Sequence, residues 1–243
     1  MRKVQKSNPI PLYYQLKEIL MELIDNEELK PGDAIPTERE LCEIHGISRM
    51  TARKAIVDLA TEGVVYREQG RGTFVAEPKI KQQLSQLKSF TEQMSEKGLN
   101  TFTNIVSFVI KDATKKICNH LELGDNKAVF EIRRLRYVED EPIAFETVWL
   151  PFHMCPELTR DTLEGESLYK ILREKFGYNF DFAKQSIEPI AINEYESKLL
   201  KIDQKSLALL FRRTTYLDDG RAIEYTKTIN RSDKYKYEVV LKS

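Results

Sequence analysis

Two pairs of arginines in this 243-residue chain have spacings that suit the binding of anions. Arg49 and Arg53 lie four residues apart, so on a helix they point to the same side. Arg134 and Arg136 lie two residues apart, so on a strand they share one face while Arg133 points to the other. Guanidinium groups bind phosphate and carboxylate oxygens in pairs, and they also bind the O6 and N7 atoms of guanine. The first pair therefore suits DNA, and the second suits a small anion.

The composition excludes several other classes of function. The chain has 38 basic and 38 acidic residues, so any preference for a nucleic acid must be local. Its three cysteines and three histidines are scattered, without the spacing of a disulfide framework or a metal site. We therefore expect a reducing cytoplasmic environment, with no metal and no cofactor. No apolar run is long enough to span a bilayer and no signal peptide is visible, so no membrane partner is expected.

The first arginine pair lies in a group of short helices joined by a tight turn. Apolar residues from Leu12 to Leu23 recur at helical spacing and predict one helix, which the turn at Lys30 to Asp33 ends. Thr37 and Glu40 have the spacing of a capping box for a second helix, which Gly46 ends in the left-handed conformation. Ser48 is the N-cap of a third helix. The predicted buried side of this third helix consists of Ala52, Ala55, Ile56 and Leu59. This pattern is a helix-turn-helix, whose last helix enters a DNA major groove.

A β-hairpin is predicted directly after these helices. Apolar residues alternate over residues 64–75, and the tip between them is basic and rich in glycine. Between Arg49 and Arg71 there are five basic and three acidic residues, so the position of the charges matters more than their number. A hairpin of this kind converts the motif into a winged helix-turn-helix. Gly70 at its tip would allow a close approach to the DNA backbone.

The segment PTERELCEIHGISRMTARKAIVDLATEGVVYREQGRGTFV resembles the DNA-binding domain of GntR-type bacterial transcription regulators. The resemblance covers roughly residues 9–77, with four motifs in the expected order, and it implies a winged helix-turn-helix domain over residues 1–77. The DNA contacts that it implies are Arg39, Ser48, Arg49, Thr51, Arg53 and Gly70. Alternatives stay open, because Arg39 can pair with Glu43 four residues on. Likewise, Thr51 can be a neutral surface residue and Gly70 an ordinary turn glycine.

The second half of the chain changes to the period of β-strands. Six stretches alternate or run apolar, at residues 103–112, 128–138, 143–151, 184–192, 207–217 and 222–231. Short helices are predicted between them, and hairpin turns at residues 139–142 and 217–221. We expect an α+β domain, with an antiparallel sheet flanked by helices. A polar linker over residues 78–88 would lead into it, through a helix whose apolar positions run from Leu84 to Met94.

From SFTEQM to RSDKYKY the order of segments resembles the UTRA effector domain of the HutC subfamily. The resemblance implies a chorismate-lyase-like fold over residues 89–243 that binds an effector and dimerises. Within this subfamily, the sequence resembles regulators of amino-sugar use, which respond to N-acetylglucosamine 6-phosphate or glucosamine 6-phosphate. Related members sense trehalose 6-phosphate, other sugar phosphates or urocanate. Amino-sugar regulators often have a tyrosine where this chain has Asn230, which leaves the identity of the sugar open.

The predicted effector site is built around Arg134 and Arg136 as an anion clamp. Backbone N–H groups, hydroxyls and a helix start would bind the same oxygens, and two glutamates would accept hydrogen bonds from sugar hydroxyls or an amine. The complete set is Ser89, Phe90, Thr91, Arg134, Arg136, Glu146, Ser167, Tyr169, Glu224 and Asn230. Three alternatives remain, namely a structural arginine–glutamate network, Ser167 as a mere helix cap, and Tyr169 as part of the core.

The sequence as a whole favours a homodimeric, ligand-responsive repressor that binds an inverted-repeat DNA operator. A lyase on the same C-terminal fold is the first alternative, although no pairing of a nucleophile with a base is visible. The second alternative is the all-helical effector class of GntR regulators. The strand-rich second half and the scattered histidines disfavour it.

Overall fold

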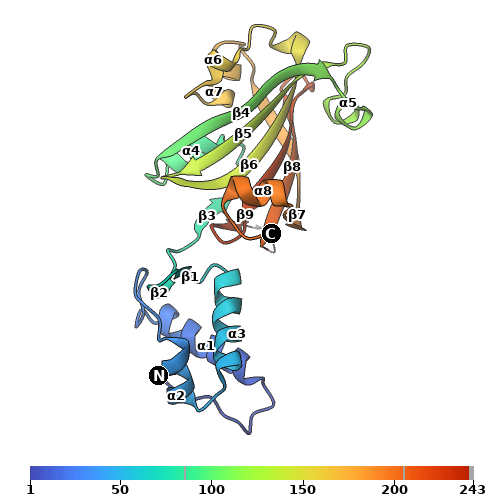
Figure 1. Cartoon of the computed structure of the whole chain (residues 1–243). Helices are drawn as coiled ribbons and strands as arrows, with labels where there is room; N and C mark the ends of the chain where they lie inside the picture. Colours follow the sequence, from blue (N-terminus) through green and yellow to red (C-terminus); the bar gives the residue numbers. More distant parts are fainter. Residues whose placement is uncertain (85, 205, 241–243) are drawn as a thin grey trace. The chain divides into compact units, whose positions relative to one another are not determined.

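The structure is a computed structural model that describes residues 1–84, 86–204 and 206–240 (Figure 1). It divides into two compact units, which we describe separately. The first contains residues 1–81 and 232–236, and the second contains residues 82–231 together with the chain from residue 237. The chain therefore passes between the units three times. No described helix is both long and apolar enough to cross a lipid bilayer.

The first unit consists of three helices and a hairpin. Its elements are α1 (Leu12–Asp25), α2 (Glu38–His45), α3 (Arg49–Thr61), β1 (Val65–Glu68) and β2 (Gly72–Val75). One apolar core joins them, because α3 buries the four residues that its sequence predicts, against leucines and isoleucines of α1 and α2. The predicted winged helix-turn-helix is confirmed.

Side-chain caps explain where the second and third helices begin and end. The hydroxyl of Thr37 accepts a hydrogen bond from the Glu40 N–H, and the Glu40 carboxylate accepts one from the Thr37 N–H. Gly46 has a φ of 64°, a left-handed conformation that suits glycine and ends α2. The Ser48 hydroxyl then accepts a hydrogen bond from the Thr51 N–H at the start of α3. The turn between the two helices is thus set by local chemistry.

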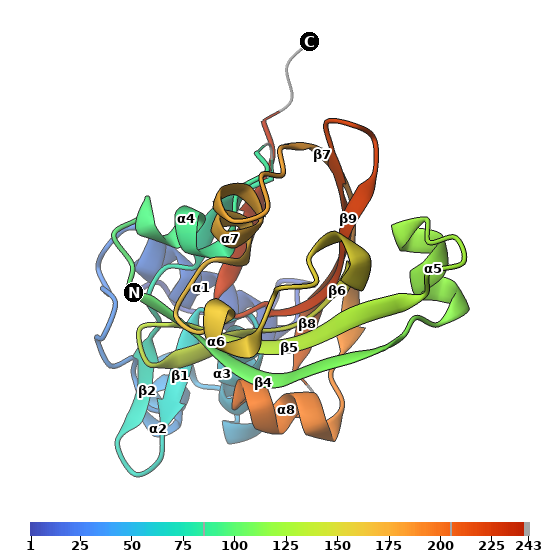
Figure 2. The same cartoon turned by 90° about the horizontal axis from the view of Figure 1, so that it is seen from above.

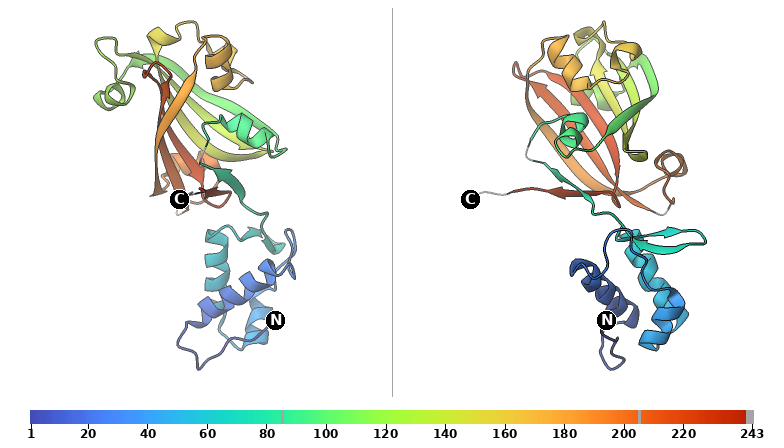
Figure 3. Two further views of the ribbon diagram at one scale, coloured as in Figure 1. Left: turned by 180° about the vertical axis from the view of Figure 1, so that it is seen from behind. Right: turned by 90° about the vertical axis from the view of Figure 1, so that its left-hand side faces the viewer.

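The second unit is built on a six-stranded antiparallel sheet. In space the strands follow the order β4-β5-β6-β9-β8-β7. Their bounds are β4 (Thr101–Asp112), β5 (Ala128–Val138), β6 (Glu141–Pro151), β7 (Phe180–Ala191), β8 (Leu207–Leu217) and β9 (Ala222–Arg231). The sheet is strongly curved (Figure 3). It confirms the predicted α+β class, because all neighbouring strands are antiparallel, β5–β6 and β8–β9 join as hairpins, and the helices lie on the two faces.

Helices cover both faces of this sheet (Figure 2). The concave face carries α4 (Phe90–Ser95), α6 (Arg160–Leu163) and α7 (Leu168–Glu174), and the last two pack on the largest apolar cluster. The convex face carries α5 (Lys115–Leu121) and α8 (Glu194–Leu200), each over a smaller cluster. A short 3-10 helix, η1 (Phe152–Met154), follows β6. The concave face between α4 and the strands stays polar, and it holds the cavity described below.

Two expectations for residues 78–94 were wrong. The stretch expected as a linker contains β3 (Ile80–Gln83), which pairs with β10 (Tyr235–Glu238) in a small separate sheet. The helix expected from Leu84 begins only at α4. Ser89 and Glu92 form a capping box there, and the N–H groups it binds define the first turn of the helix. Ser85, which falls within both expected elements, lies outside the described residues.

Candidate functional site

The first candidate site is the exposed start of α3 in the first unit. The side chains of Arg49, Met50 and Arg53 are exposed there, while the opposite side of the helix is buried in the core. Neither arginine has a hydrogen-bond or ion-pair partner among the described residues. Their guanidinium groups are therefore available to phosphates or base edges.

The other predicted DNA contacts lie in the same unit, and most have an alternative partner within it. The Arg39 Nε donates to Glu43 Oε1 at 2.9 Å, but both side chains are exposed, so this ion pair is weak and easily exchanged. The hydroxyl oxygens of Ser48 and Thr51 lie 2.8 Å apart. Gly70, with a φ of 76°, forms the exposed tip of the β1–β2 hairpin. DNA contact by these residues stays a prediction.

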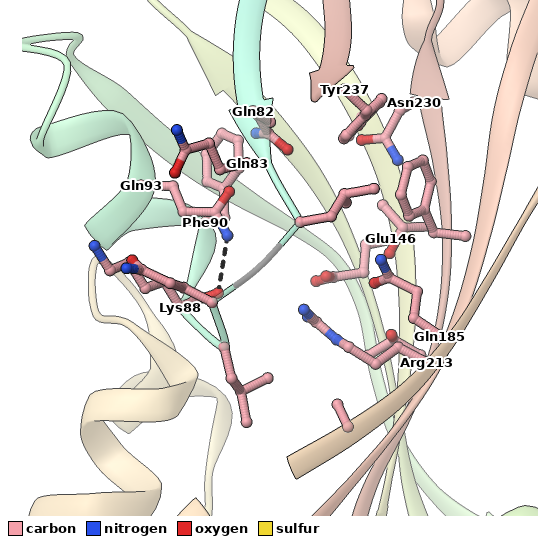
Figure 4. Close-up of a pocket in the computed structure, with 18 of the residues that line it drawn as sticks. Gln82, Gln83, Lys88, Phe90, Gln93, Glu146, Gln185, Arg213, Asn230 and Tyr237 are labelled. Atoms are coloured by element: carbon pink, nitrogen blue, oxygen red, sulfur yellow. Dashed lines mark hydrogen bonds between the residues drawn. The ribbon is translucent and has the colours of Figure 1, made fainter. Parts of the chain in front are cut away.

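The second candidate site is a cavity of about 350 Å³ on the concave face of the sheet in the second unit (Figure 4). Its floor comes from β5, β6, β8 and β9, and its other walls come from β7, α4 and the chain before α4. Side chains rich in hydrogen-bonding groups line it, among them Arg136, Glu146, Arg213, Asn230, Gln82, Gln83, Gln86, Gln93 and Gln185. A cavity of this size and polarity fits a small, highly polar molecule.

An ion network connects the floor of the cavity to the sheet beneath it. Glu146 lies directly opposite Arg134 across the β5–β6 ladder. Its Oε2 accepts hydrogen bonds from the Arg134 Nε and the Arg136 Nη2, both at 2.9 Å. Arg134 is fully buried, whereas Arg136 lines the cavity, donates to Thr103 Oγ1 and lies 5.2 Å from the ring centre of Phe90. The arginine pair thus shares one carboxylate.

Glu146 and Arg136 keep their charges at neutral pH. Burial alone would raise the pKa of Glu146, but the positive charges of Arg134, Arg136 and Arg213 outweigh it and lower this pKa to about 2. Burial and the like charge of Arg134 lower the pKa of Arg136 to about 10. The cavity therefore presents a permanent mixture of positive and negative groups.

A second buried network joins Tyr169, Thr215 and Glu224. The Tyr169 hydroxyl donates to Glu224 Oε2 at 2.8 Å, and the Thr215 hydroxyl donates to the same oxygen at 2.9 Å. Burial raises the pKa of the Tyr169 phenol, so it stays protonated. Among the residues that the structure describes, no three His, Cys, Asp or Glu side chains gather as metal ligands would.

The structure brings only part of the predicted effector set to the cavity wall. Four of its members line the cavity, namely Phe90, Arg136, Glu146 and Asn230. The other six are Ser89, Thr91, Arg134, Ser167, Tyr169 and Glu224. The hydroxyls of Ser89 and Ser167 cap α4 and α7, while Thr91 is exposed on α4. The part that each residue takes in effector binding stays a prediction.

Sequence reasoning missed Arg213 and the amide side chains. Arg213 lies on β8, opposite Gln185 of β7 and Thr226 of β9. The sequence indicated that one of two arginines lies on the cavity face, because Arg212 and Arg213 are adjacent on a strand and must point to opposite faces. Which of the two faces the cavity depends on the register between β8 and β9, which the sequence does not specify.

A winged helix-turn-helix with exposed arginines on its third helix, joined to a unit with a polar cavity, defines a DNA-binding transcription regulator that responds to a small molecule. The comparison with protein families agrees. Residues 12–75 match the bacterial regulatory proteins of the gntR family, and residues 96–236 match the UTRA domain. The chain therefore belongs to the GntR family of regulators, in the HutC-type group that carries a UTRA domain.

Individual relatives support this assignment. The transcriptional repressor NagR of Bacillus subtilis (strain 168) is 38% identical over 96% of each chain. The mannosyl-D-glycerate transport/metabolism system repressor MngR of Escherichia coli (strain K12) is 34% identical over 95% of each. The crystal structure of PhnF from Mycobacterium smegmatis matches with a TM-score of 0.66 and 28% identity, over 93% of this chain and 99% of that one. The chain is thus a regulator rather than a lyase, and its sheet excludes the all-helical effector class.

Proposed function

We propose that this protein is a repressor of genes for the uptake or breakdown of a sugar, and that a phosphorylated sugar controls its binding to an operator. Glucosamine 6-phosphate and N-acetylglucosamine 6-phosphate are the leading effectors. The names of two relatives support a role in sugar metabolism, since MngR represses a mannosyl-D-glycerate system and another relative represses fructoselysine utilisation.

The observation that carries the proposed effector class is the combination of side chains in the cavity. Two guanidinium groups, of Arg136 and Arg213, share it with six primary amides. Guanidinium groups bind the oxygens of phosphate, and amides both donate to and accept from hydroxyl groups. A molecule with one anionic group and many hydroxyls satisfies both kinds of side chain. A sugar phosphate has this chemistry.

On the DNA side we propose that residues 1–77 read the operator, while residues 89–243 bind the effector and form a homodimer. Arg49 and Arg53 would contact base edges, and Arg39, Ser48, Thr51 and Gly70 the phosphate backbone. Two copies would bind the two halves of an inverted repeat. Because the partner is chromosomal DNA of a bacterial cell, we place the protein in the cytoplasm.

Asn230 supports a second candidate within the same class. It lines the cavity at a position where amino-sugar regulators often have a tyrosine, and its side chain is shorter than a phenol. A sugar phosphate with a different or larger sugar, such as trehalose 6-phosphate, would fit the space that the shorter side chain leaves. A carboxylate such as urocanate could use the arginines but would leave most amides without hydroxyl partners.

Operator binding in the presence of candidate effectors tests the proposal. The operator would be selected from random-sequence DNA with the purified protein, and its affinity measured with and without each compound. We expect glucosamine 6-phosphate or N-acetylglucosamine 6-phosphate to change the affinity about 5- to 150-fold, and the sugars without phosphate to change it little. A response to trehalose 6-phosphate or urocanate alone would support the alternative, and no response to any sugar phosphate would reject the proposed effector class.

A further inference from the structure

Arg213 differs from the other basic groups at the cavity, Lys88 and Arg136, in having no bonded partner among the described residues. Its Nε atom is buried and makes no hydrogen bond, and its guanidinium group forms no ion pair with a described residue. The side chain points into the cavity beside Gln185 (Figure 4), and its Cζ lies 5.8 Å from the ring centre of Tyr169. An arginine keeps its charge in such a place, so the protein holds a positive charge there without a bonded anion.

The buried carboxylates around the cavity are already engaged elsewhere, and Asp181, which also lines it, is exposed to solvent. Glu146 accepts hydrogen bonds from Arg134 and Arg136. Glu224 accepts hydrogen bonds from the hydroxyls of Tyr169 and Thr215. Glu146 and Glu224 act on Arg213 only through space, without a hydrogen bond. Burying a charge without a hydrogen-bonded partner is unfavourable, so a guanidinium group with free donors at a cavity wall points to a ligand that bonds to it. Arg213 has the free donors that an anion requires.

Arg136 and Arg213 line the same cavity from two strands of the floor. Arg136 lies on β5 and Arg213 on β8, and β6 and β9 separate them. The side chains between them on the floor include the small residues Ala144, Thr226 and Thr228, which leave space above the sheet. The Nε of Arg136 is also buried without a hydrogen-bond partner among the described residues. Both guanidinium groups can therefore reach one ligand above this floor.

We propose that Arg213 is a binding residue for the anionic oxygens of the effector, and that it holds them together with Arg136. A guanidinium group binds phosphate or carboxylate through two parallel hydrogen bonds. The amide of Gln185, opposite Arg213 on β7, adds a neutral hydrogen-bonding group beside it. The inference rests on the proposed function, and it assigns the charged end of the effector to a residue outside the Arg134–Arg136 pair.

The adjacent residue provides a matched control. Arg212 lies on the same strand but on the convex face, where it pairs with Glu188. Arg212→Gln and Arg213→Gln therefore remove one positive charge each, from neighbouring positions on opposite faces of one sheet. Arg213→Lys is a third variant that keeps the charge and loses the two-pronged geometry.

Binding is measured by calorimetry and by the rise in melting temperature of the full chain. The probes are glucosamine 6-phosphate, glucosamine and inorganic phosphate, at matched ionic strength. We expect Arg213→Gln to weaken the binding of glucosamine 6-phosphate about 10- to 100-fold, and Arg212→Gln to leave it unchanged. Arg213→Lys should fall between them. Without a probe, Arg213→Gln loses the attraction of this charge to Glu146 and Glu224, so it should melt somewhat lower than the wild type. A merely structural role predicts this loss alone, with the rise in melting temperature on adding glucosamine 6-phosphate unchanged.

Two results would separate this inference from the proposed function. If inorganic phosphate stabilises the wild type and Arg212→Gln but not Arg213→Gln, and glucosamine 6-phosphate acts no better than phosphate, the anion site stands and the sugar phosphate is wrong. If Arg213→Gln and Arg213→Lys bind both phosphate compounds as the wild type does, Arg213 is not the anion-binding residue. The same conclusion follows if neither compound stabilises the wild type.

Discussion

Glu146 is the residue on which the ion network of the cavity depends, because it is the acid that two buried arginines share. Glu146→Gln would keep the shape of the side chain and remove the negative charge to which Arg134 and Arg136 are hydrogen-bonded. We expect a loss of about 3–5 kcal/mol in the free energy of unfolding at neutral pH. Chemical denaturation, followed by the fluorescence of the single tryptophan, Trp149, measures this loss.

The pH dependence of the same variant adds a second check. The folded pKa of Glu146, about 2, lies below its ordinary value, so acid protonates this group in the unfolded chain first. Its contribution to stability is complete above about pH 5 and is lost as the pH falls towards 2. The difference between wild type and Glu146→Gln should shrink over that range. Glu131→Gln is the control, because the charged partners of Glu131, Lys111 and Arg133, are about two-fifths exposed and solvent screens them. The amide oxygen of the glutamine can still accept the hydrogen bond of Trp149. Equal losses in the two variants would contradict the assigned role of Glu146.

A substitution of Arg53 should change DNA binding without changing the stability of the fold. Its side chain is exposed and unpaired among the described residues, so Arg53→Ala should change the free energy of unfolding by less than about 0.5 kcal/mol. Binding to the selected operator should weaken by about 1–3 kcal/mol. Random-sequence DNA is the control, and its affinity should fall much less. Unchanged operator affinity would mean that Arg53 does not contact the operator.

At this scale the sequence predicted the helix starts and the burial side of α3 well, because caps and periodicity are local signals. It predicted the pairing of Arg134 and Arg136 with a glutamate only as one of several alternatives. The choice of Glu146 depends on the β5–β6 register, which brings residues 12 positions apart face to face. Arg213 could not be assigned to the cavity for the same reason.

Among the elements, the end of α3 makes a close backbone contact within the first unit. Gly63 follows this helix with a φ of 72°, and a Cβ atom there would lie 2.8 Å from the Cα and carbonyl oxygen of Asp233. The segment 232–236 thus fits against a position where only glycine leaves room.

Gly63→Ala should therefore destabilise the first unit by more than the backbone strain that an alanine has in the left-handed conformation. Gly32→Ala is the matched control, because Gly32 has a φ of 86° and open space around it. The control should cost about 1–2 kcal/mol, and Gly63→Ala more than that. Hydrogen exchange of the amides of residues 232–236 should accelerate only in Gly63→Ala. Equal costs and equal exchange would mean that this segment does not pack against Gly63.

The region before α4 shows why some elements escaped prediction. Strand β3 has four residues of mixed polarity, and its partner β10 lies about 150 residues further along the chain. Nothing in the local sequence indicates such a pairing, so a polar stretch reads as a linker. The six long strands were predictable because each carries its own apolar period and four pairs of them are neighbours in sequence or joined by hairpins.

For the whole molecule, the cavity lies close in sequence to every place where the chain leaves the second unit. Gln82, Asn230 and Tyr237 all line it. The chain changes unit between residues 81 and 82, between 231 and 232, and between 236 and 237. A ligand that moves any of these three side chains therefore acts on backbone that continues directly into the first unit. Covalent continuity of this kind suits a regulator whose effector must influence DNA binding.

The return of residues 232–236 to the first unit also affects how the protein is made. A ribosome that has completed residue 81 has released the three helices and the hairpin, but not the strip of chain that packs against Gly63. At about 5–20 residues per second, that strip follows on the order of 10 s later. The first unit is completed only after residues 82–231 of the second unit have been synthesised. A nascent chain therefore carries most of the second unit before its first unit is complete.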